Sequence, residues 1–259
     1  MVLQQLLTIA SVLAVFVTVL FVLSIIVKRN DIADVAWGVG ISLVAAVSYL
    51  VQTEENVLLT ILLVLIVLWG VRLSARIFLR NLKKSEDYRY KKWRDDWGSW
   101  FYIRSYFQVY LLQGFLMIVV GYSAIHTSVY GVGSTLSIFT ILGILIWCVG
   151  YFFEVMGDLQ LDRFISSKPE AGTVLSTGLW KYTRHPNYFG EVTMWWGLWL
   201  IVAPLPLSYL ALVSPLTITF LILKVSGIPM LEKKFAGNVQ FEAYKKRTSA
   251  FFPLPPKNN

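Results

Sequence analysis

The chain has 259 residues, of which 56% are hydrophobic and 15% are charged, and its mean hydropathy is +0.63. Soluble globular proteins carry about 25% charged residues, so this composition excludes that class and indicates an integral membrane protein. The single cysteine, Cys148, excludes disulfides and thiolate metal sites, and two histidines are too few for a histidine-rich metal centre, so we expect no metal site.

Seven apolar segments approach or reach the roughly 20 residues that a helix needs to cross the membrane. The predicted spans are residues 3–27, 33–51, 57–79, 106–127, 135–156, 188–203 and 207–225. The first is long enough to span and has no cleavage-like site, so we expect a helix and not a signal peptide. The sixth is short and is followed by Pro204-Leu205-Pro206, so six spans with a re-entrant hairpin are the alternative.

The predicted fold class is an all-α integral membrane protein. We expect a single polytopic domain, residues 1–259, in which a seven-transmembrane helix bundle carries cytoplasmic loops that form a cofactor cap. The tail, residues 227–259, is predicted to form one amphipathic helix followed by an extended, proline-limited end.

The distribution of Lys and Arg predicts the orientation. With the N-terminus outside, the outer connections 52–56, 128–134 and 204–206 contain neither residue, and all 23 basic residues lie on the inner side. This obeys the positive-inside rule, so we expect a cytoplasmic C-terminus and a bacterial inner membrane. The rule also explains the net charge of +8 without nucleic-acid binding, and we expect a monomer in contact with membrane lipid.

The first cytoplasmic segment begins with three arginines, Arg72, Arg76 and Arg80, spaced by four residues and hence on one helix face. Arg72 lies about two turns deeper than Arg80, and a deep arginine usually faces a partner or a wet cavity. The run from Lys83 to Tyr90 mixes both signs of charge with two tyrosines. It indicates either a folded lid with internal ion pairs or a solvated loop.

An acidic stripe follows the fifth span, because Glu154, Asp158 and Asp162 are spaced by four residues. Like charges at this spacing repel each other unless a donor lies opposite, and we expect Arg72, Arg76 or Arg184 in that place. A salt-bridge network and direct cofactor contact both explain the stripe.

The residues 178–191, GLWKYTRHPNYFGE, concentrate cationic, aromatic and amide groups where a polar loop enters the sixth span. Pro186 favours the first turn of a helix, whose free amides suit a phosphate. Asn187 and Glu191 lie one turn apart on the same face. An interfacial anchor is the alternative, but it requires neither of them, so we interpret the stretch as the head of an anionic-cofactor site.

The second span carries an acidic residue, Asp34, on nearly the same face as Trp37. Asp34 either complements the dipole of the helix or faces inward as a protonated acid that binds a substrate oxygen.

The stretch GLWKYTRHPNYFGE, together with the preceding DLQLDRF and RNLKKSEDYRY, resembles bacterial membrane proteins of the steroid 5α-reductase superfamily. The similarity extends from about Asp31 to the tail. The RHP-x-Y core alone is also found in isoprenylcysteine and phospholipid methyltransferases and in sterol C14 and C24 reductases. The EDYRY loop and the full N-Y-F-G-E favour the 5α-reductase branch.

This resemblance implies seven membrane helices, an NADPH site that faces the cytoplasm, and reduction of the C4–C5 double bond of 3-oxo-Δ4 steroids. It implies that Asp158, Asn187 and Glu191 contact the nicotinamide-ribose and phosphate portions of NADPH. By the same resemblance, Asn81, Lys84 and Arg163 hold the adenosine phosphates. The remaining expected cofactor residues are Arg72, Arg76, Glu86, Asp87, Tyr88, Tyr182, Arg184, His185 and Pro186.

The substrate end departs from the family pattern. The animal enzymes hold the ketone with a Glu on the second helix and a Tyr on the third, whereas here the nearest residues are Asp34, Trp37 and Trp69. The predicted catalytic residues are Asp34, Trp37, Tyr188 and Glu191, acting on a lipophilic enone or steroid.

Two other functions remain open. A membrane S-adenosylmethionine-dependent methyltransferase has a similar loop, but its cofactor carries no phosphates and requires no basic lining. A non-enzymatic transporter or scaffold leaves the pairing of Asn187 with Glu191 unexplained.

Overall fold

The computed structural model describes residues 2–82 and 84–257, and this part of the chain is helical, without β-strands. Six of its helical runs are long and apolar enough to cross a membrane: Leu3–Val27, Ile32–Leu50, Val57–Leu82, Tyr88–Val120, Ile138–Ser166 and Ser208–Lys234. The prediction of an integral membrane protein with several transmembrane helices is therefore confirmed. The chain divides into two compact units, Met1–Leu136 with Leu205–Val213, and Ser137–Pro204 with Ser214–Asn259.

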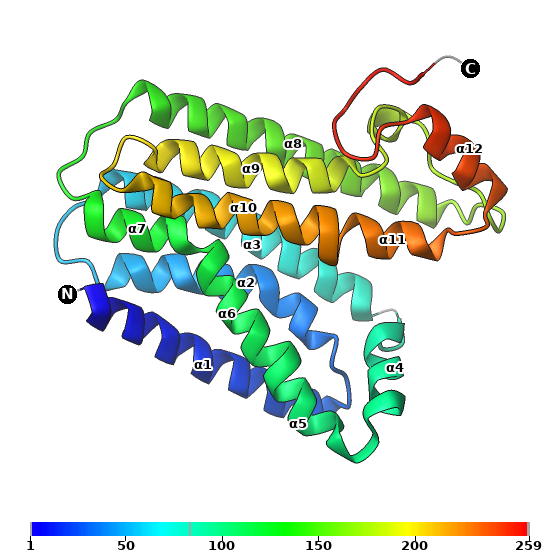
Figure 1. Cartoon of the computed structure of the whole chain (residues 1–259), viewed down its shortest axis with the longest axis horizontal. Helices are drawn as coiled ribbons and strands as arrows, with labels where there is room; N and C mark the ends of the chain where they lie inside the picture. Colours follow the sequence, from blue (N-terminus) through cyan, green and yellow to red (C-terminus); the bar gives the residue numbers. More distant parts are fainter. Residues whose placement is uncertain (1, 83, 258–259) are drawn as a thin grey trace. The chain divides into compact units, whose positions relative to one another are not determined.

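The first unit is built around α2. Its helices are α1 (Val2–Val27), α2 (Ile32–Leu50), α3 (Val57–Leu82), α4 (Tyr88–Trp97), α5 (Phe101–Ser105), α6 (Leu112–Val120) and α7 (Tyr122–Tyr130), with a π-helical stretch, Tyr106–Leu111, between α5 and α6 (Figure 1). Helix α2 packs against α1, α3, α6 and α7, which places its small residues at the centre of the unit.

The contact between α2 and α3 is close enough to exclude side chains. A Cβ atom on Gly38 would lie 2.3 Å from the carbonyl oxygen of Gly70, and one on Gly70 would lie 2.4 Å from that of Gly38. The hydroxyl of Ser74 donates to the carbonyl of Val35 at 2.7 Å and accepts from the amide of Val39 at 3.1 Å. It thus enters the hydrogen-bond ladder of α2, a known cause of helix bending.

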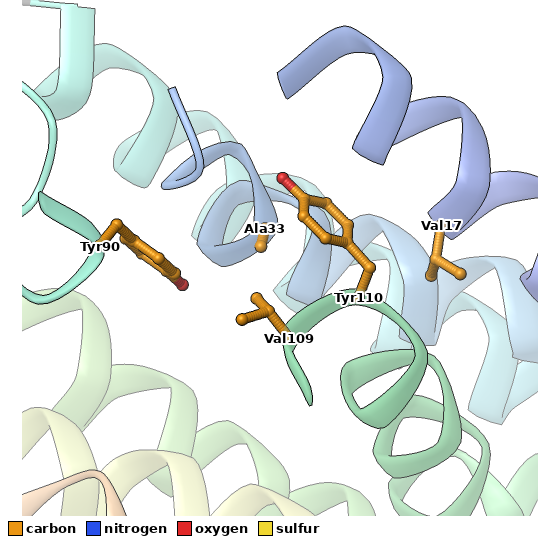
Figure 2. Close-up of a cluster of buried hydrophobic side chains, with 5 residues drawn as sticks. All are labelled: Val17, Ala33, Tyr90, Val109 and Tyr110. Atoms are coloured by element: carbon orange, nitrogen blue, oxygen red, sulfur yellow. The ribbon is translucent and has the colours of Figure 1, made fainter. Parts of the chain in front are cut away.

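A buried cluster holds α4 to this framework. Val17 from α1, Ala33 from α2, Tyr90 from α4, and Val109 with Tyr110 from the π-helical stretch pack together, each at most 4% exposed. Figure 2 shows the rings of Tyr90 and Tyr110 on either side of Ala33. The loop after α3 is therefore anchored through aromatic packing at the N-terminal turn of α2.

The second unit contains α8 (Ile138–Ser166), α9 (Pro186–Val202), most of α10 (Val213–Phe220), α11 (Ile228–Lys234) and α12 (Val239–Arg247). Helices α8 and α9 run side by side (Figure 1). Helix α8 begins with a capping box formed by Ser137 and Thr140.

Glycines let the backbones of α8 and α9 touch. Gly143, Gly150 and Gly157 repeat every seven residues on α8, as do Gly190 and Gly197 on α9. A Cβ atom on Gly190 would lie 2.4 Å from the carbonyl oxygen of Gly150, and one on Gly197 would lie 2.7 Å from that of Gly143. We call these five residues the glycine seam.

Several helix boundaries differ from the sequence-based predictions, and the fifth and seventh spans end later than predicted, at Ser166 and Lys234. The fourth span, predicted at 106–127, begins at Tyr88 and ends at Val120, because a charged amphipathic helix precedes the apolar stretch and α7 is a separate helix after Gly121. The sixth predicted span, 188–203, is α9, whose 17 residues extend about 26 Å. It is not among the six long apolar helices of the described residues.

The prediction of one tail helix is wrong, since α11 and α12 are separate. Gly237 between them has a φ of +83°, which interrupts the helix. The side chain of Asn238 then caps α12 by accepting from the amide of Phe241 at 3.0 Å.

Candidate functional site

In the second unit, the stretch before α9 lies against the C-terminal tail. Thr183 pairs with Ser249 in an isolated parallel bridge, and the amide of Arg184 donates to the Ser249 carbonyl at 2.9 Å. The amide of Leu254 donates to the carbonyl of Tyr182 at 3.0 Å. These backbone bonds hold the Arg-His-Pro sequence in one conformation.

Arg184 is the buried centre of this arrangement, with a side chain that is 7% exposed. Its Nε and Nη2 donate to Oε1 of Glu232 on α11, at 2.9 and 2.7 Å. Its Nη1 donates to the carbonyls of Lys245 and Thr248 at the end of α12. Arg184 therefore joins the start of α9 to both tail helices.

His185 shares the same carboxylate. Its Nε2 lies 3.3 Å from Oε1 of Glu232, and its ring stacks on Tyr188 with centroids 5.6 Å apart. Lys245 Nζ lies 3.6 Å from Oε2 of Glu232. Nδ1 of His185 is buried and has no hydrogen-bond partner among the described residues. With Arg184, two permanent cations face one carboxylate, so the cluster carries excess positive charge.

Helix α12 also clamps the loop that precedes this stretch. The hydroxyl of Tyr244 donates to the carbonyl of Trp180, and the indole of Trp180 donates to the carbonyl of Gly157 at 3.1 Å. The amide of Leu179 donates to Gln160 Oε1 at 2.9 Å. Burial raises the pKa of the Tyr244 hydroxyl, which keeps it protonated as a donor.

The acidic stripe on α8 is buried at two of its three positions. Glu154 and Asp158 are 2% and 3% exposed, whereas Asp162 is exposed. Asn187 Nδ2 donates to Asp158 Oδ1 at 3.2 Å, and Asn187 Oδ1 accepts from the amide of Tyr188 at 3.1 Å. Asn187 thus links the stripe to the first turn of α9.

Two expectations about this region change. Arg184, one of the cations expected opposite the stripe, pairs instead with Glu232. The first turn of α9 offers fewer free amides than expected, because the amide of Tyr188 is bonded to Asn187 and that of His185, the N-cap residue, donates to Thr183 Oγ1 at 3.3 Å.

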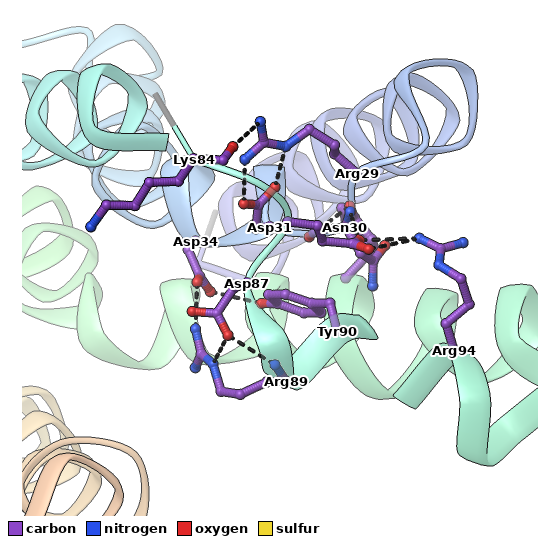
Figure 3. Close-up of polar contacts among 11 residues, drawn as sticks. Arg29, Asn30, Asp31, Asp34, Lys84, Asp87, Arg89, Tyr90 and Arg94 are labelled. Carbon is purple, nitrogen blue, oxygen red and sulfur yellow. Dashed lines mark hydrogen bonds and ion pairs between the residues drawn. The ribbon is translucent and has the colours of Figure 1, made fainter. Parts of the chain in front are cut away.

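In the first unit, Asp34 is the centre of a second polar cluster (Figure 3). Its Oδ2 lies 2.6 Å from Arg89 Nη2, and its Oδ1 accepts from the hydroxyl of Tyr90 at 2.7 Å. Arg89 also pairs with Asp87 at 2.9 Å, and Asp87 caps α4. Both oxygens of Asp34 therefore act as acceptors. Asp34 thus faces Arg89 and Tyr90 within the first unit, and its action as a donor to a substrate stays a prediction.

The described residues between α3 and α4, 84–87, make ion pairs and hydrogen bonds with α4 and with the connection between α1 and α2, whereas a lid stays a prediction. Glu86 pairs with Arg94 at 3.1 Å and accepts from the amide of Asn30 at 2.7 Å. Arg29 donates to the carbonyl of Lys84 at 3.1 Å. Glu86 and Asp87 make these structural contacts, and their role at a cofactor stays a prediction.

The other predicted site residues fall into both units. The first unit contains one exposed member of this set, Tyr88, and four half-buried ones: Trp37, Arg72, Arg76 and Asn81. The second unit contains the half-buried Glu191 and the exposed Arg163 and Tyr182.

The residues that the sequence-based prediction missed are Arg89, Tyr90, Glu232 and Tyr244. Tyr90 belongs to the EDYRY motif, which lies outside the third span, where the family resemblance implies a tyrosine. Nothing in the sequence around Glu232 indicates that it pairs with Arg184, which lies 48 positions away.

The two clusters belong to an integral membrane protein with a buried Arg-His-Pro motif and an Asp–Tyr pair at the start of its second helix. The model of the family described as "protein of unknown function (DUF1295)" matches residues 20–248. The chain belongs to this family, a domain of the steroid 5α-reductase-like superfamily. Comparison with curated proteins and with solved structures gives no match.

Proposed function

We propose that this protein is an NADPH-dependent reductase of the conjugated double bond of a lipophilic enone, with 3-oxo-Δ4 steroids as the first substrate class to test. The observation that carries the proposal is the buried Tyr90 hydroxyl, which Asp34 holds at the start of α2. The family resemblance implied an acid–tyrosine pair for the ketone, and these two side chains form such a pair within the first unit.

The reaction needs a donor at the substrate oxygen. When a hydride adds to the β carbon of an enone, negative charge develops on the carbonyl oxygen, and one well-placed donor lowers the barrier by about 3–4 kcal/mol. Tyr90 is suited to this role because its hydroxyl can turn from Asp34 to the ketone. Arg89 keeps Asp34 paired when this happens, since its ion pair with Asp34 is independent of Tyr90.

The residues of the second unit fit a phosphate-bearing cofactor. Arg184 and Lys245 outnumber the one carboxylate that they share, and Nδ1 of His185 is a buried polar atom without a partner among the described residues. S-adenosylmethionine has no phosphate to match this charge. We assign the phosphates to His185 and its neighbours, and the nicotinamide-ribose to Asp158 and Asn187. Bound NADPH would supply the hydride.

The test compares the wild type with Tyr90→Phe in detergent, with NADPH binding and steady-state enone reduction measured separately. We expect Tyr90→Phe to bind NADPH normally and to lose about 10²–10³ in kcat. Tyr110→Phe is the matched control, because Tyr110 lies in the same buried cluster but its hydroxyl donates to the Asn30 carbonyl, at 3.4 Å, whereas that of Tyr90 donates to Asp34. A full rate in Tyr90→Phe would remove Tyr90 from the mechanism, and binding of S-adenosylmethionine in place of NADPH would overturn the proposed reaction.

We also propose that α9 is the seventh span, with the N-terminus outside and the C-terminus in the cytoplasm of a bacterial cell. The support is the absence of Lys and Arg from the outer connections. In a Cys148→Ala background, an impermeant thiol reagent should label Glu55→Cys in intact cells. Ser85→Cys and Lys257→Cys should react only after permeabilisation, and the reverse pattern would contradict this topology.

A further inference from the structure

His185 is held by one of its two ring nitrogens. Nε2 faces Glu232 Oε1 at 3.3 Å, and the ring face is covered by Tyr188. The side chain is only 6% exposed, and Nδ1 is buried without a hydrogen-bond partner among the described residues. A buried polar atom without a hydrogen bond is unfavourable by about 1–3 kcal/mol, which points to a ligand at Nδ1.

We propose that His185 takes up a proton when a phosphate group binds at its Nδ1, and that Glu232 is the positioning residue that prepares the ring for this event. The inference rests on the proposed function, since NADPH is the expected phosphate-bearing ligand.

The tautomer follows from the carboxylate. A neutral histidine beside Glu232 carries its hydrogen on Nε2, where it can donate to Oε1, so Nδ1 presents a lone pair. A lone pair repels a phosphate oxygen. The repulsion becomes a charge-assisted hydrogen bond when Nδ1 takes a proton from solvent, and both ring nitrogens then donate.

The charges around the ring come from each element packed against it. Arg184 precedes it in the chain, Tyr188 lies on α9, Glu232 on α11 and Lys245 on α12. Without a ligand, the two cations oppose a third positive charge. The Glu232 carboxylate favours such a charge, and an incoming phosphate brings further negative charge to the same place, so we expect proton uptake by His185 on binding.

The chain is well suited to a direct measurement, because His126 and His185 are its only histidines. Protein labelled with ¹⁵N-histidine should give two sets of ring signals, which His126→Gln and His185→Gln assign. In the free protein we expect His185 with hydrogen on Nε2 only. With saturating NADPH we expect both nitrogens of His185 to be protonated at neutral pH, and His126 to be unchanged.

Affinity gives a second measurement. The dissociation constant for NADPH should rise more steeply with pH in the wild type than in His185→Gln. The 2′-phosphate titrates equally in both measurements, so its effect cancels when the two slopes are subtracted. His185→Gln should weaken binding about 10- to 100-fold at neutral pH. In Glu232→Gln, which still offers an oxygen to Nε2 but no charge, protonation of His185 by NADPH should be incomplete.

The outcomes separate the two proposals. NADPH binding with His185 still neutral, or equal pH slopes in the wild type and His185→Gln, would overturn the proton uptake and leave the reductase proposal intact. If NADPH does not bind but sulfate protonates His185, the anion site stands and the proposed cofactor is wrong. Sulfate is the suitable probe because it does not titrate near neutral pH.

Discussion

Replacement of Gly190 by alanine should separate α8 from α9. The added Cβ atom would lie 2.4 Å from the carbonyl oxygen of Gly150 and 2.5 Å from the amide nitrogen of Glu154. Both neighbours are backbone atoms of a helix, so neither can rotate away. To restore an ordinary contact of 3.4 Å, the two helices must move apart by about 1 Å at this point.

Two opposing effects set the size of the change. Overpacking of a well-packed interface destabilises by about 1–3 kcal/mol, and rigid backbone neighbours place this site at the upper end. Alanine in place of glycine stabilises a helix by about 1 kcal/mol. The net expectation is a loss of about 2 kcal/mol, which lowers Tm by roughly 4–8 °C for a chain of this size.

The assay is thermal unfolding in one detergent, followed by intrinsic tryptophan fluorescence, for the wild type, Gly190→Ala and Gly114→Ala. Gly114 is the matched control, because its nearest neighbour is a methyl group of the Val17 side chain at 3.2 Å, which can shift. Gly114→Ala should therefore melt within about 2 °C of the wild type. Equal melting temperatures for the two variants would refute the argument that backbone contact at the glycine seam holds the second unit together.

Further predictions concern the hydrogen bonds of Asp87, Tyr244 and Ser74. Asp87→Ala removes the cap of α4 and should lower the free energy of unfolding by about 1 kcal/mol, whereas Asp87→Asn, which still caps, should lose less; equal losses in thermal melts would contradict the capping role. Tyr244→Phe leaves the Trp180 carbonyl without this donor and should destabilise the tail by about 1–3 kcal/mol, measured as faster limited proteolysis after residue 227. Because burial raises the pKa of Tyr244, its contribution should be constant from pH 7 to 9 and decline only above about pH 10, where the unfolded tyrosine ionises; an earlier decline would contradict this assignment. Ser74→Ala should change amide exchange at Val39, whose N–H donates to the Ser74 hydroxyl, and unchanged exchange there would place the hydroxyl outside the α2 ladder.

The sequence by itself determined the membrane class and most of the apolar helices. Hydropathy over a window of about 20 residues is a local property of the sequence. The hydrocarbon core of the membrane stabilises an apolar helix of this length regardless of how the helices pack. The same locality explains the position of α9, which begins at Pro186 as the proline predicted. It also explains the errors at α4 and in the tail. The ends of the charged helices α4, α11 and α12, and the break at Gly237, are set by contacts with distant parts of the chain and not by local hydropathy.

Only the tertiary structure decided the partners of the buried polar groups. Asp34 meets Arg89 from 55 positions along the chain, and Arg184 meets Glu232 from 48 positions away. The protonation and bonding of such a group depend on which charges and donors lie within a few ångströms of it. No local pattern around Asp34 reveals that an arginine and a tyrosine from α4 bond to its two oxygens. Nor does the sequence near His185 reveal that its Nε2 faces Glu232 while its Nδ1 is buried without a partner among the described residues.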